Sequence, residues 1–178
     1  MTSPETSSLL SLAIWLPIVG AIPVLMLGSK RRDAMRWAAL VVALAAFAVT
    51  LPLFIGFDNR EVAMQFVEKA PWISRFNIFY HLGVDGISMP FILLNSFITI
   101  LVVLAGWEVI EAKQAQYMAA FLVMSGLMNG IFSALDGVLF YVFFEASLIP
   151  MYLIIGVWGG PNRVYAALKF FLYTLLGS

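Results

Sequence analysis

A single carboxylate lies in the middle of an otherwise uncharged apolar run. Glu145 falls within residues 138–157, VLFYVFFEASLIPMYLIIGV, which carry no other charged side chain. A run of this length can cross a bilayer as a helix, and an ionised carboxylate at its centre costs about 2.5–3.5 kcal/mol on insertion scales. Such a group is typically kept to be moved, matched or protonated, so we predict that Glu145 is a functional residue. A structural ion pair that locks two helices is the alternative.

Two tyrosines share the helix face of this carboxylate. At about 100° per residue, Tyr141 and Tyr152 fall within a narrow arc around Glu145, where their hydroxyls could bind the carboxyl group or hold water beside it. Tyrosines near helix ends are also typical of the aromatic belt at the membrane interface. The belt interpretation is favoured for Tyr141, whereas for the candidate relay Tyr152 the belt and the carboxylate partner are equally supported. Pro150 cannot donate to the carbonyl of Ala146, which predicts a kink just after the glutamate.

Lys169 and His81 are the other candidate relay residues. On a helix that starts near Arg163, Lys169 would lie roughly 9 Å from one membrane face, whereas Glu145 would lie about 18 Å from it on the antiparallel neighbour. Direct contact is therefore not expected, and a water-bridged link or a snorkelling lysine remain open. His81 is a candidate because histidine is the side chain most often used as a proton relay, although a hydrogen-bonded interfacial histidine is the more usual interpretation at the edge of a membrane loop.

The composition indicates an integral membrane protein. Of the 178 residues, 62% are hydrophobic and 11% charged, and the mean hydropathy is +0.97, against about 45–50% apolar and about 25% charged residues in soluble domains. The net charge of zero gives no indication of nucleic-acid binding. The lack of cysteine excludes thiolate-ligated iron–sulfur clusters, and the single histidine excludes a bis-histidine haem from this chain alone. We expect no metal or cofactor site here, and redox chemistry would belong to other polypeptides.

The elements that must position these residues are membrane helices. Apolar runs of near-spanning length predict an all-α, polytopic helix bundle, a single membrane domain over residues 1–178, with helices at 9–28, 37–56, 88–107, 117–135, 138–157 and 163–178. The last run is only about half a span, which predicts a fragment of a longer protein. The long loop 57–87 has β-type residues at 64–67 and 77–82 that could form a small hairpin.

Basic residues predict the orientation of the bundle. Lys30, Arg31, Arg32 and Arg36 cluster between the first two helices, and the positive-inside rule puts this loop in the cytoplasm. The N-terminus and the loop 57–87 are then extracytoplasmic.

Other polar residues suggest caps and helix contacts. Asp136 reads as the N-cap of the fifth helix, and Asp85 or Ser88 as that of the third. Gly126 and Gly130 have a spacing suited to close helix packing. The fourth helix also carries polar residues that could form interhelical hydrogen bonds: Ser125, Asn129 and Ser133.

Two stretches carry a resemblance to a known family. Residues 141–178, with the motif FFEASLIPMYLIIGVWG, and residues 80–94, YHLGVDGISMPFILL, closely resemble the antiporter-like family of subunit M of bacterial NADH-quinone oxidoreductase and mitochondrial subunit 4. The resemblance implies part of a fold of about fourteen helices, built from two inverted five-helix repeats. It further implies that Glu145 is the essential glutamate of the fifth helix, which tunes a lysine on the seventh helix, beyond Ser178.

The resemblance also implies a function. It implies a proton-translocating subunit of respiratory complex I in the bacterial inner membrane or the mitochondrial inner membrane. The expected partners are other membrane-arm subunits, especially neighbouring antiporter-like subunits, and the lipid bilayer. The flavin, iron–sulfur clusters and quinone would belong to other subunits. The alternatives are a subunit of a multisubunit cation/proton antiporter or membrane-bound hydrogenase, and a structural membrane scaffold. A scaffold would tolerate glutamine at Glu145, whereas a translocating subunit would not.

Overall fold

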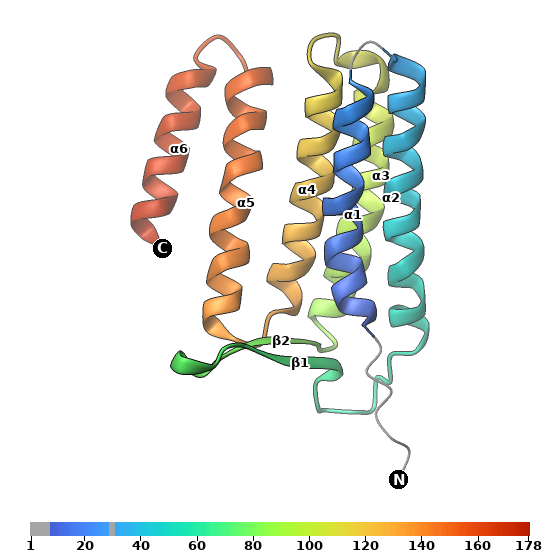
Figure 1. Ribbon diagram of the computed structural model, residues 1–178, viewed down its shortest axis with the longest axis vertical. Helices are drawn as coiled ribbons and strands as arrows, with labels where there is room; N and C mark the ends of the chain where they lie inside the picture. The colour runs from blue at the N-terminus through green and yellow to red at the C-terminus, as the bar shows by residue number, and fades with distance from the viewer. Residues whose placement is uncertain (1–7, 29–30) are drawn as a thin grey trace.

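Six helices run along one common axis, and a two-stranded hairpin crosses one end of the bundle (Figure 1). The computed structural model describes residues 8–28 and 31–178. In chain order its elements are α1 (Leu9–Leu27), α2 (Arg32–Ile55), β1 (Gln65–Ile73), the short 3-10 helix η1 (Ser74–Phe76), β2 (Ile78–Val84), α3 (Ser88–Val109), α4 (Gln114–Ser133), α5 (Gly137–Trp158) and α6 (Arg163–Gly177). We call the end with the strands the hairpin end.

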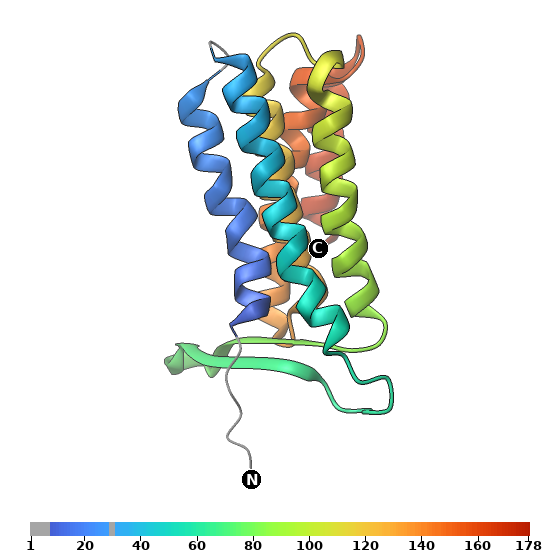
Figure 2. The ribbon, with the colours of Figure 1, turned by 90° about the vertical axis from the view of Figure 1, so that its right-hand side faces the viewer.

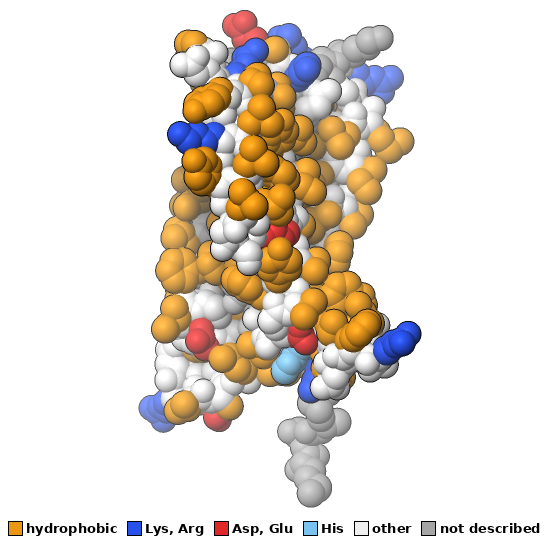
Figure 3. Space-filling model, turned by 90° about the vertical axis from the view of Figure 1, so that its left-hand side faces the viewer, with side chains coloured by type: hydrophobic (Ala, Val, Ile, Leu, Met, Phe, Trp, Pro, Cys, Tyr) orange, Lys and Arg blue, Asp and Glu red, His pale blue; other side chains and the backbone are white. Residues whose placement is uncertain are grey.

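The helices have the length and surface of membrane spans. Helices α1 to α5 are each long and apolar enough to cross a bilayer, whereas α6 has 15 residues. Large apolar side chains cover much of the outer surface, and over the middle of the face in Figure 3 few charged side chains interrupt them. Such a surface is suited to lipid or to other membrane helices rather than to water. The predicted all-α, polytopic bundle is confirmed.

Among the helices, the start of α2 differs most from the sequence prediction. The helix begins at Arg32 rather than at residue 37. Its first turn is charged, so the apolar run that predicts the helix does not include it, although the turn is helical. Arg36 donates from Nε to Gln114 Oε1 (3.3 Å) and from Nη2 to the carbonyl of Trp107. This places a positive charge at the C-terminal end of α3, where the helix dipole favours it. Lys30, of the same basic cluster, lies outside the described residues.

Helices α1 to α4 pack closely around two buried apolar clusters, and α5 and β2 contribute to one of them. One lies near the hairpin end and includes Leu10, Ile14 and Phe143; the other lies toward the opposite end and includes Val24, Met35 and Leu122. Two glycines of α4 allow close approach on two sides. A Cβ atom at Gly126 would lie 2.5 Å from Ile18 Cγ1 of α1, and one at Gly130 would lie 2.7 Å from the Phe143 ring of α5. The predicted close packing at these glycines is confirmed.

Asp136 is the N-cap of α5, as predicted, whereas the N-cap position of α3 is Ile87, between the two predicted candidates. Asp136 Oδ1 accepts hydrogen bonds from the backbone N–H groups of Val138 (2.9 Å) and Leu139 (3.2 Å) at the start of α5. Ahead of α3, Asp85 Oδ1 accepts from the Ser88 N–H (2.7 Å), and Ser88 Oγ accepts from the Asp85 N–H (3.0 Å). The two candidates for the α3 cap therefore bond to each other just ahead of the helix, in a reciprocal arrangement like that of a capping box.

The hairpin is longer than the sequence suggested. Its strands cover Gln65–Ile73 and Ile78–Val84, rather than only 64–67 and 77–82, and they pair antiparallel with Glu68 opposite Leu82 and Ala70 opposite Tyr80. Irregular register next to Gln65 and Pro71 obscured the alternation of the first strand. Figure 2 shows the strands lying across the end of the bundle, transverse to the helices.

Candidate functional site

Glu145 lies in the interior of α5, one helix away from the end of the chain. α5 continues without interruption through Pro150 to Trp158, and the predicted kink stays a prediction. The Glu145 side chain is partly exposed. Its Oε1 accepts a hydrogen bond from the Ser178 hydroxyl, which also lies 3.2 Å from the Leu175 carbonyl oxygen of α6. This contact connects the carboxylate to the last turn of α6.

A hollow of about 530 Å³ opens between α5 and α6 beside this contact. Tyr141 contributes to its wall and is 44% exposed, one turn before Glu145 on the same helix face. Among the described residues Tyr141 makes no hydrogen bond to the carboxylate. The hollow is lined by Phe140, Tyr141, Phe144, Thr174, Gly177 and Ser178. Glu145 therefore lies next to a largely apolar space.

The candidate relays Tyr152 and Lys169 lie on other contacts. The Tyr152 ring packs edge-on against Phe171 of α6, with centroids 5.7 Å apart, so this tyrosine contributes to the α5–α6 interface. The Lys169 ammonium lies 5.7 Å from the centroid of Tyr165 and 5.8 Å from that of Tyr173, its neighbours four residues away on α6. Cation–π contacts of this kind contribute about 0.5–1 kcal/mol at exposed sites. Within the described part of the chain, no ion pair joins Lys169 to Glu145.

His81 lies at the hairpin end, next to the start of α5. It is on β2, and its carbonyl accepts a hydrogen bond of 2.8 Å from the Leu135 N–H in the turn between α4 and α5. Backbone N–H groups, first that of Phe79 and then that of Leu139, hold the pKa of Asp136 below its ordinary value, with a smaller attraction from His81. Glu145 follows Asp136 by nine residues, or roughly 13 Å of helix, so His81 is not placed beside it.

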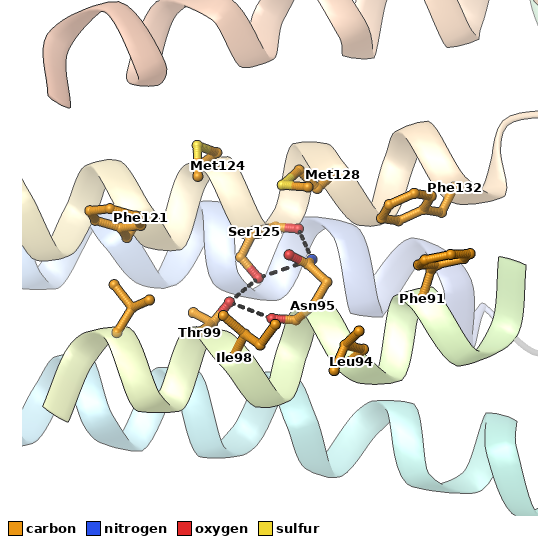
Figure 4. A pocket seen from close by; sticks show the side chains of 11 residues that line it. Phe91, Leu94, Asn95, Ile98, Thr99, Phe121, Met124, Ser125, Met128 and Phe132 are labelled. Atoms are coloured by element: carbon orange, nitrogen blue, oxygen red, sulfur yellow. Dashed lines mark hydrogen bonds between the residues drawn. The ribbon is translucent and has the colours of Figure 1, made fainter. Parts of the chain in front are cut away.

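A buried polar cluster between α1, α3 and α4 was only partly foreseen. Asn129 Nδ2 donates to the Ala13 carbonyl of α1 (3.0 Å), while its Oδ1 accepts from Asn95 Nδ2 of α3 (2.7 Å). Thr99 Oγ1 donates to Ser125 Oγ (2.8 Å). In Figure 4, Asn95 and Thr99 point from α3 toward Ser125 on α4. The interhelical roles of Asn129 and Ser125 are confirmed.

The same cluster corrects one prediction and adds two residues. Ser133 Oγ bonds to carbonyls of its own helix, at Asn129 (2.7 Å) and Gly130 (3.4 Å), so its predicted interhelical bond is wrong. A hydroxyl near a helix end readily bonds to a carbonyl one turn earlier. Asn95 and Thr99 were missed, although two polar residues four apart in an apolar helix are a usable signal. A cavity of about 220 Å³ lies over Asn95, Thr99 and Ser125, with otherwise apolar walls.

Glu68, a buried carboxylate at the hairpin end, was missed entirely. It lies on β1, is 9% exposed, and its Oε1 accepts from the backbone N–H groups of Leu10 (2.8 Å) and Ser11 (3.2 Å) at the start of α1. Nothing in the local sequence around residue 68 indicates a partner that lies 58 residues earlier in the chain. In the described residues, no group of three or more His, Cys, Asp or Glu side chains could hold a metal ion.

Comparison with known proteins decides the family. Residues 11–133 match the family "NADH-ubiquinone oxidoreductase chain 4, amino terminus". The chain belongs to this family. Residues 134–178, which include Glu145, match the family "NADH:quinone oxidoreductase/Mrp antiporter, TM". The family resemblance noted in the sequence is thereby confirmed.

Members of the chain 4 family align along nearly the whole chain. NADH-quinone oxidoreductase subunit M of Rhodobacter capsulatus is 50% identical over 176 residues, covering 96% of this chain and 34% of that protein. NADH-ubiquinone oxidoreductase chain 4 of Arabidopsis thaliana is 44% identical, covering 95% and 34%. A chain of the respiratory complex I structure from Thermus thermophilus with bound NADH superposes with a TM-score of 0.80 at 30% identity, covering 94% and 33%. The chain thus spans about a third of the length of these relatives, and its fold is the corresponding part of the antiporter-like fold.

Proposed function

We propose that this chain forms the amino-terminal part of a proton-translocating, antiporter-like membrane subunit of NADH:quinone oxidoreductase. The observation that carries the proposal is Glu145, a partly exposed carboxylate in the interior of a span-length helix, within the residues that match the quinone oxidoreductase and antiporter family. An intramembrane carboxylate is retained against its insertion cost where it serves charge or proton movement. Electrons would pass from NADH to quinone in other subunits, which would hold the flavin, the iron–sulfur clusters and the quinone.

The setting of the subunit follows from the same proposal. Its partners would be other membrane-arm subunits, above all neighbouring antiporter-like ones, and the membrane would be the bacterial inner or the mitochondrial inner membrane. The basic residues Arg31, Arg32 and Arg36 lie at the end of the bundle opposite the hairpin. By the positive-inside rule this end is cytoplasmic or in the mitochondrial matrix, and the hairpin end and the N-terminus lie on the other side.

Glu145 acts in this proposal as a switchable counter-charge. When ionised, it would stabilise a protonated lysine on a helix beyond residue 178, the position that the family resemblance implies. At 4 Å and an effective dielectric of about 20, such a pair interacts by about 4 kcal/mol, equivalent to roughly three pKa units. Weakening the pair would therefore release the lysine proton near neutral pH.

The proposal is tested by Glu145→Gln in the complete subunit, assembled in its complex. We expect NADH-driven proton pumping to fall at least tenfold, because glutamine has nearly the same shape but carries no charge. Glu108→Gln is the matched control, since Glu108 is exposed in the last turn of α3. Wild-type pumping and coupled quinone reduction in Glu145→Gln would favour a structural scaffold.

A multisubunit cation/proton antiporter is the second candidate. It is supported by the match of residues 134–178, whose family includes Mrp antiporters as well as quinone oxidoreductases. The match of residues 11–133 to the chain 4 family favours the first proposal. Purification of the native complex distinguishes the two: co-purification of NADH dehydrogenase activity supports the oxidoreductase, whereas sodium/proton exchange without that activity supports the antiporter.

A further inference from the structure

The hairpin is fastened to the start of α1 by a buried carboxylate. Glu68 Oε1 accepts from the backbone N–H groups of Leu10 and Ser11, and Oε2 accepts from the Ser11 hydroxyl. These N–H groups belong to the first turn of α1 and have no partner within the helix. A carboxylate is stabilised there by the positive end of the helix dipole as well as by its charge-assisted hydrogen bonds.

The second strand is fastened to the same helix end. Tyr80 lies opposite Ala70, so it projects from the same face of the hairpin as Glu68. Its hydroxyl lies 3.0 Å from Ser11 Oγ and accepts a hydrogen bond from Trp15 Nε1 (3.2 Å). We call Glu68, Tyr80 and the residues of α1 that they bind the α1 anchor.

The same strand is also fastened to the start of α5. Asp136, the N-cap of α5, accepts a hydrogen bond from the Phe79 N–H on Oδ2 (3.1 Å), and the Leu135 N–H donates to the His81 carbonyl (2.8 Å). A Cβ atom at Gly83 would lie 2.7 Å from Leu135 Cδ1, so the strand packs tightly on this turn. We call these contacts the α5 anchor. Consecutive residues of β2, Phe79 and Tyr80, thus belong to different anchors.

We propose that the hairpin is a tie between the starts of α1 and α5, and that Glu68 is the positioning residue that holds it in place. Phe79 and His81 flank Tyr80 on β2, so a displacement of the hairpin from α1 moves the groups that hold Asp136. Asp136 in turn caps the first turn of α5, the helix that carries Glu145. Among the described residues Glu68 makes no hydrogen bond to α5, so its effect there passes through the strand.

The tie has a consequence for Glu145 that rests on the proposed function. The contacts at Asp136 hold the first turn of α5, which fixes the depth of the helix in the membrane and its rotation about its own axis. Glu145 is thereby kept facing its proposed cationic partner. Loss of Glu68 should then lower proton pumping without altering any group beside Glu145. The structural tie does not depend on this consequence.

Hydrogen–deuterium exchange in the assembled complex tests the tie without reference to pumping. Two peptides are followed, one covering residues 8–14 and the other residues 134–141. In Glu68→Ala we expect exchange to become at least tenfold faster at Leu10 and Ser11, and severalfold faster at Val138 and Leu139. Glu61→Ala is the matched control, because Glu61 is exposed in the loop before β1. It should change neither peptide.

Two further variants keep the test decisive. Glu68→Gln retains Oε1 as an acceptor for both N–H groups, so it should restore most of the protection in both peptides. Asp136→Ala releases the α5 anchor from the other side and should speed exchange at Leu10 and Ser11. Faster exchange at α1 alone in Glu68→Ala, with α5 unchanged, would overturn the tie, as would unchanged exchange in both peptides. If exchange in Glu68→Ala becomes faster in both peptides as expected but proton pumping stays at the wild-type rate, only the consequence for Glu145 is overturned.

Discussion

Asn129 supplies a hydrogen bond that a proline removes from α1. In a regular helix the Ala13 carbonyl would accept from the N–H of residue 17, but Pro17 has none. Asn129 Nδ2 lies 3.0 Å from that carbonyl oxygen and donates to it, while Asn129 Oδ1 accepts from Asn95. The asparagine is 1% exposed, so water does not replace either bond. Asn129 therefore compensates α1 for its proline.

Asn129→Leu keeps the size of the side chain and removes both bonds, together with a longer one from Nδ2 to Ser96 Oγ (3.4 Å). Interhelical hydrogen bonds in membrane proteins contribute about 0.6–2 kcal/mol each, and an unsatisfied carbonyl adds to the loss. We expect the free energy of unfolding of the chain in detergent micelles, titrated with sodium dodecyl sulfate, to fall by about 2 kcal/mol. In a Pro17→Ala background, the backbone N–H of Ala at position 17 can donate to the Ala13 carbonyl. Asn129→Leu should then lower the free energy of unfolding by only about 1 kcal/mol. Equal losses in the two backgrounds would refute the compensation.

Two further predictions concern helix packing and the cap of α5. Gly126→Val should lower the free energy of unfolding by about 1–3 kcal/mol, because a Cβ atom there collides with Ile18 and with the backbone of α1. Gly160→Val is the control in the same detergent titration, because a Cβ atom at Gly160 meets open space. Asp136 has a lowered pKa in the folded state, so its contribution is present above its ordinary pKa of about 3.9 and is lost as the pH falls through the folded value. The difference in unfolding midpoint between wild type and Asp136→Asn should therefore shrink below about pH 4. If the difference in unfolding midpoint between the two proteins grows as the pH falls, the lowered pKa assigned to Asp136 in the folded state is contradicted.

The spans and caps could be predicted from sequence because their signals are local. Long apolar runs predict α1 to α5, since every backbone polar group must be satisfied within a membrane helix. Asp136 could be assigned as a cap because its partners lie two and three residues away. The start of α2 was missed because charged residues and helical structure coincide there. Arg36 is held by partners on α3 and α4, which no local pattern reveals.

The anchors of the hairpin could not be predicted for the same reason. Glu68 and Leu10 come together only when the strand pairing and the position of α1 are both known. Glu145 was found because a lone charge in an apolar run is visible without any structure. Its surroundings were not foreseen: Lys169 contacts tyrosines of its own helix, and Tyr152 packs against Phe171. The sequence thus indicates the residue for which a role in translocation is proposed, whereas the geometry around that residue depends on helix packing.

The central claim is that the charge of Glu145 drives translocation. The most direct measurement is the number of protons pumped per NADH oxidised in liposomes containing the complete complex with Glu145→Gln, beside Glu108→Gln. The account predicts a lower ratio in Glu145→Gln alone, while quinone reduction measured with an uncoupler present keeps at least part of its rate. An unchanged ratio and an unchanged coupled rate in Glu145→Gln would contradict the account.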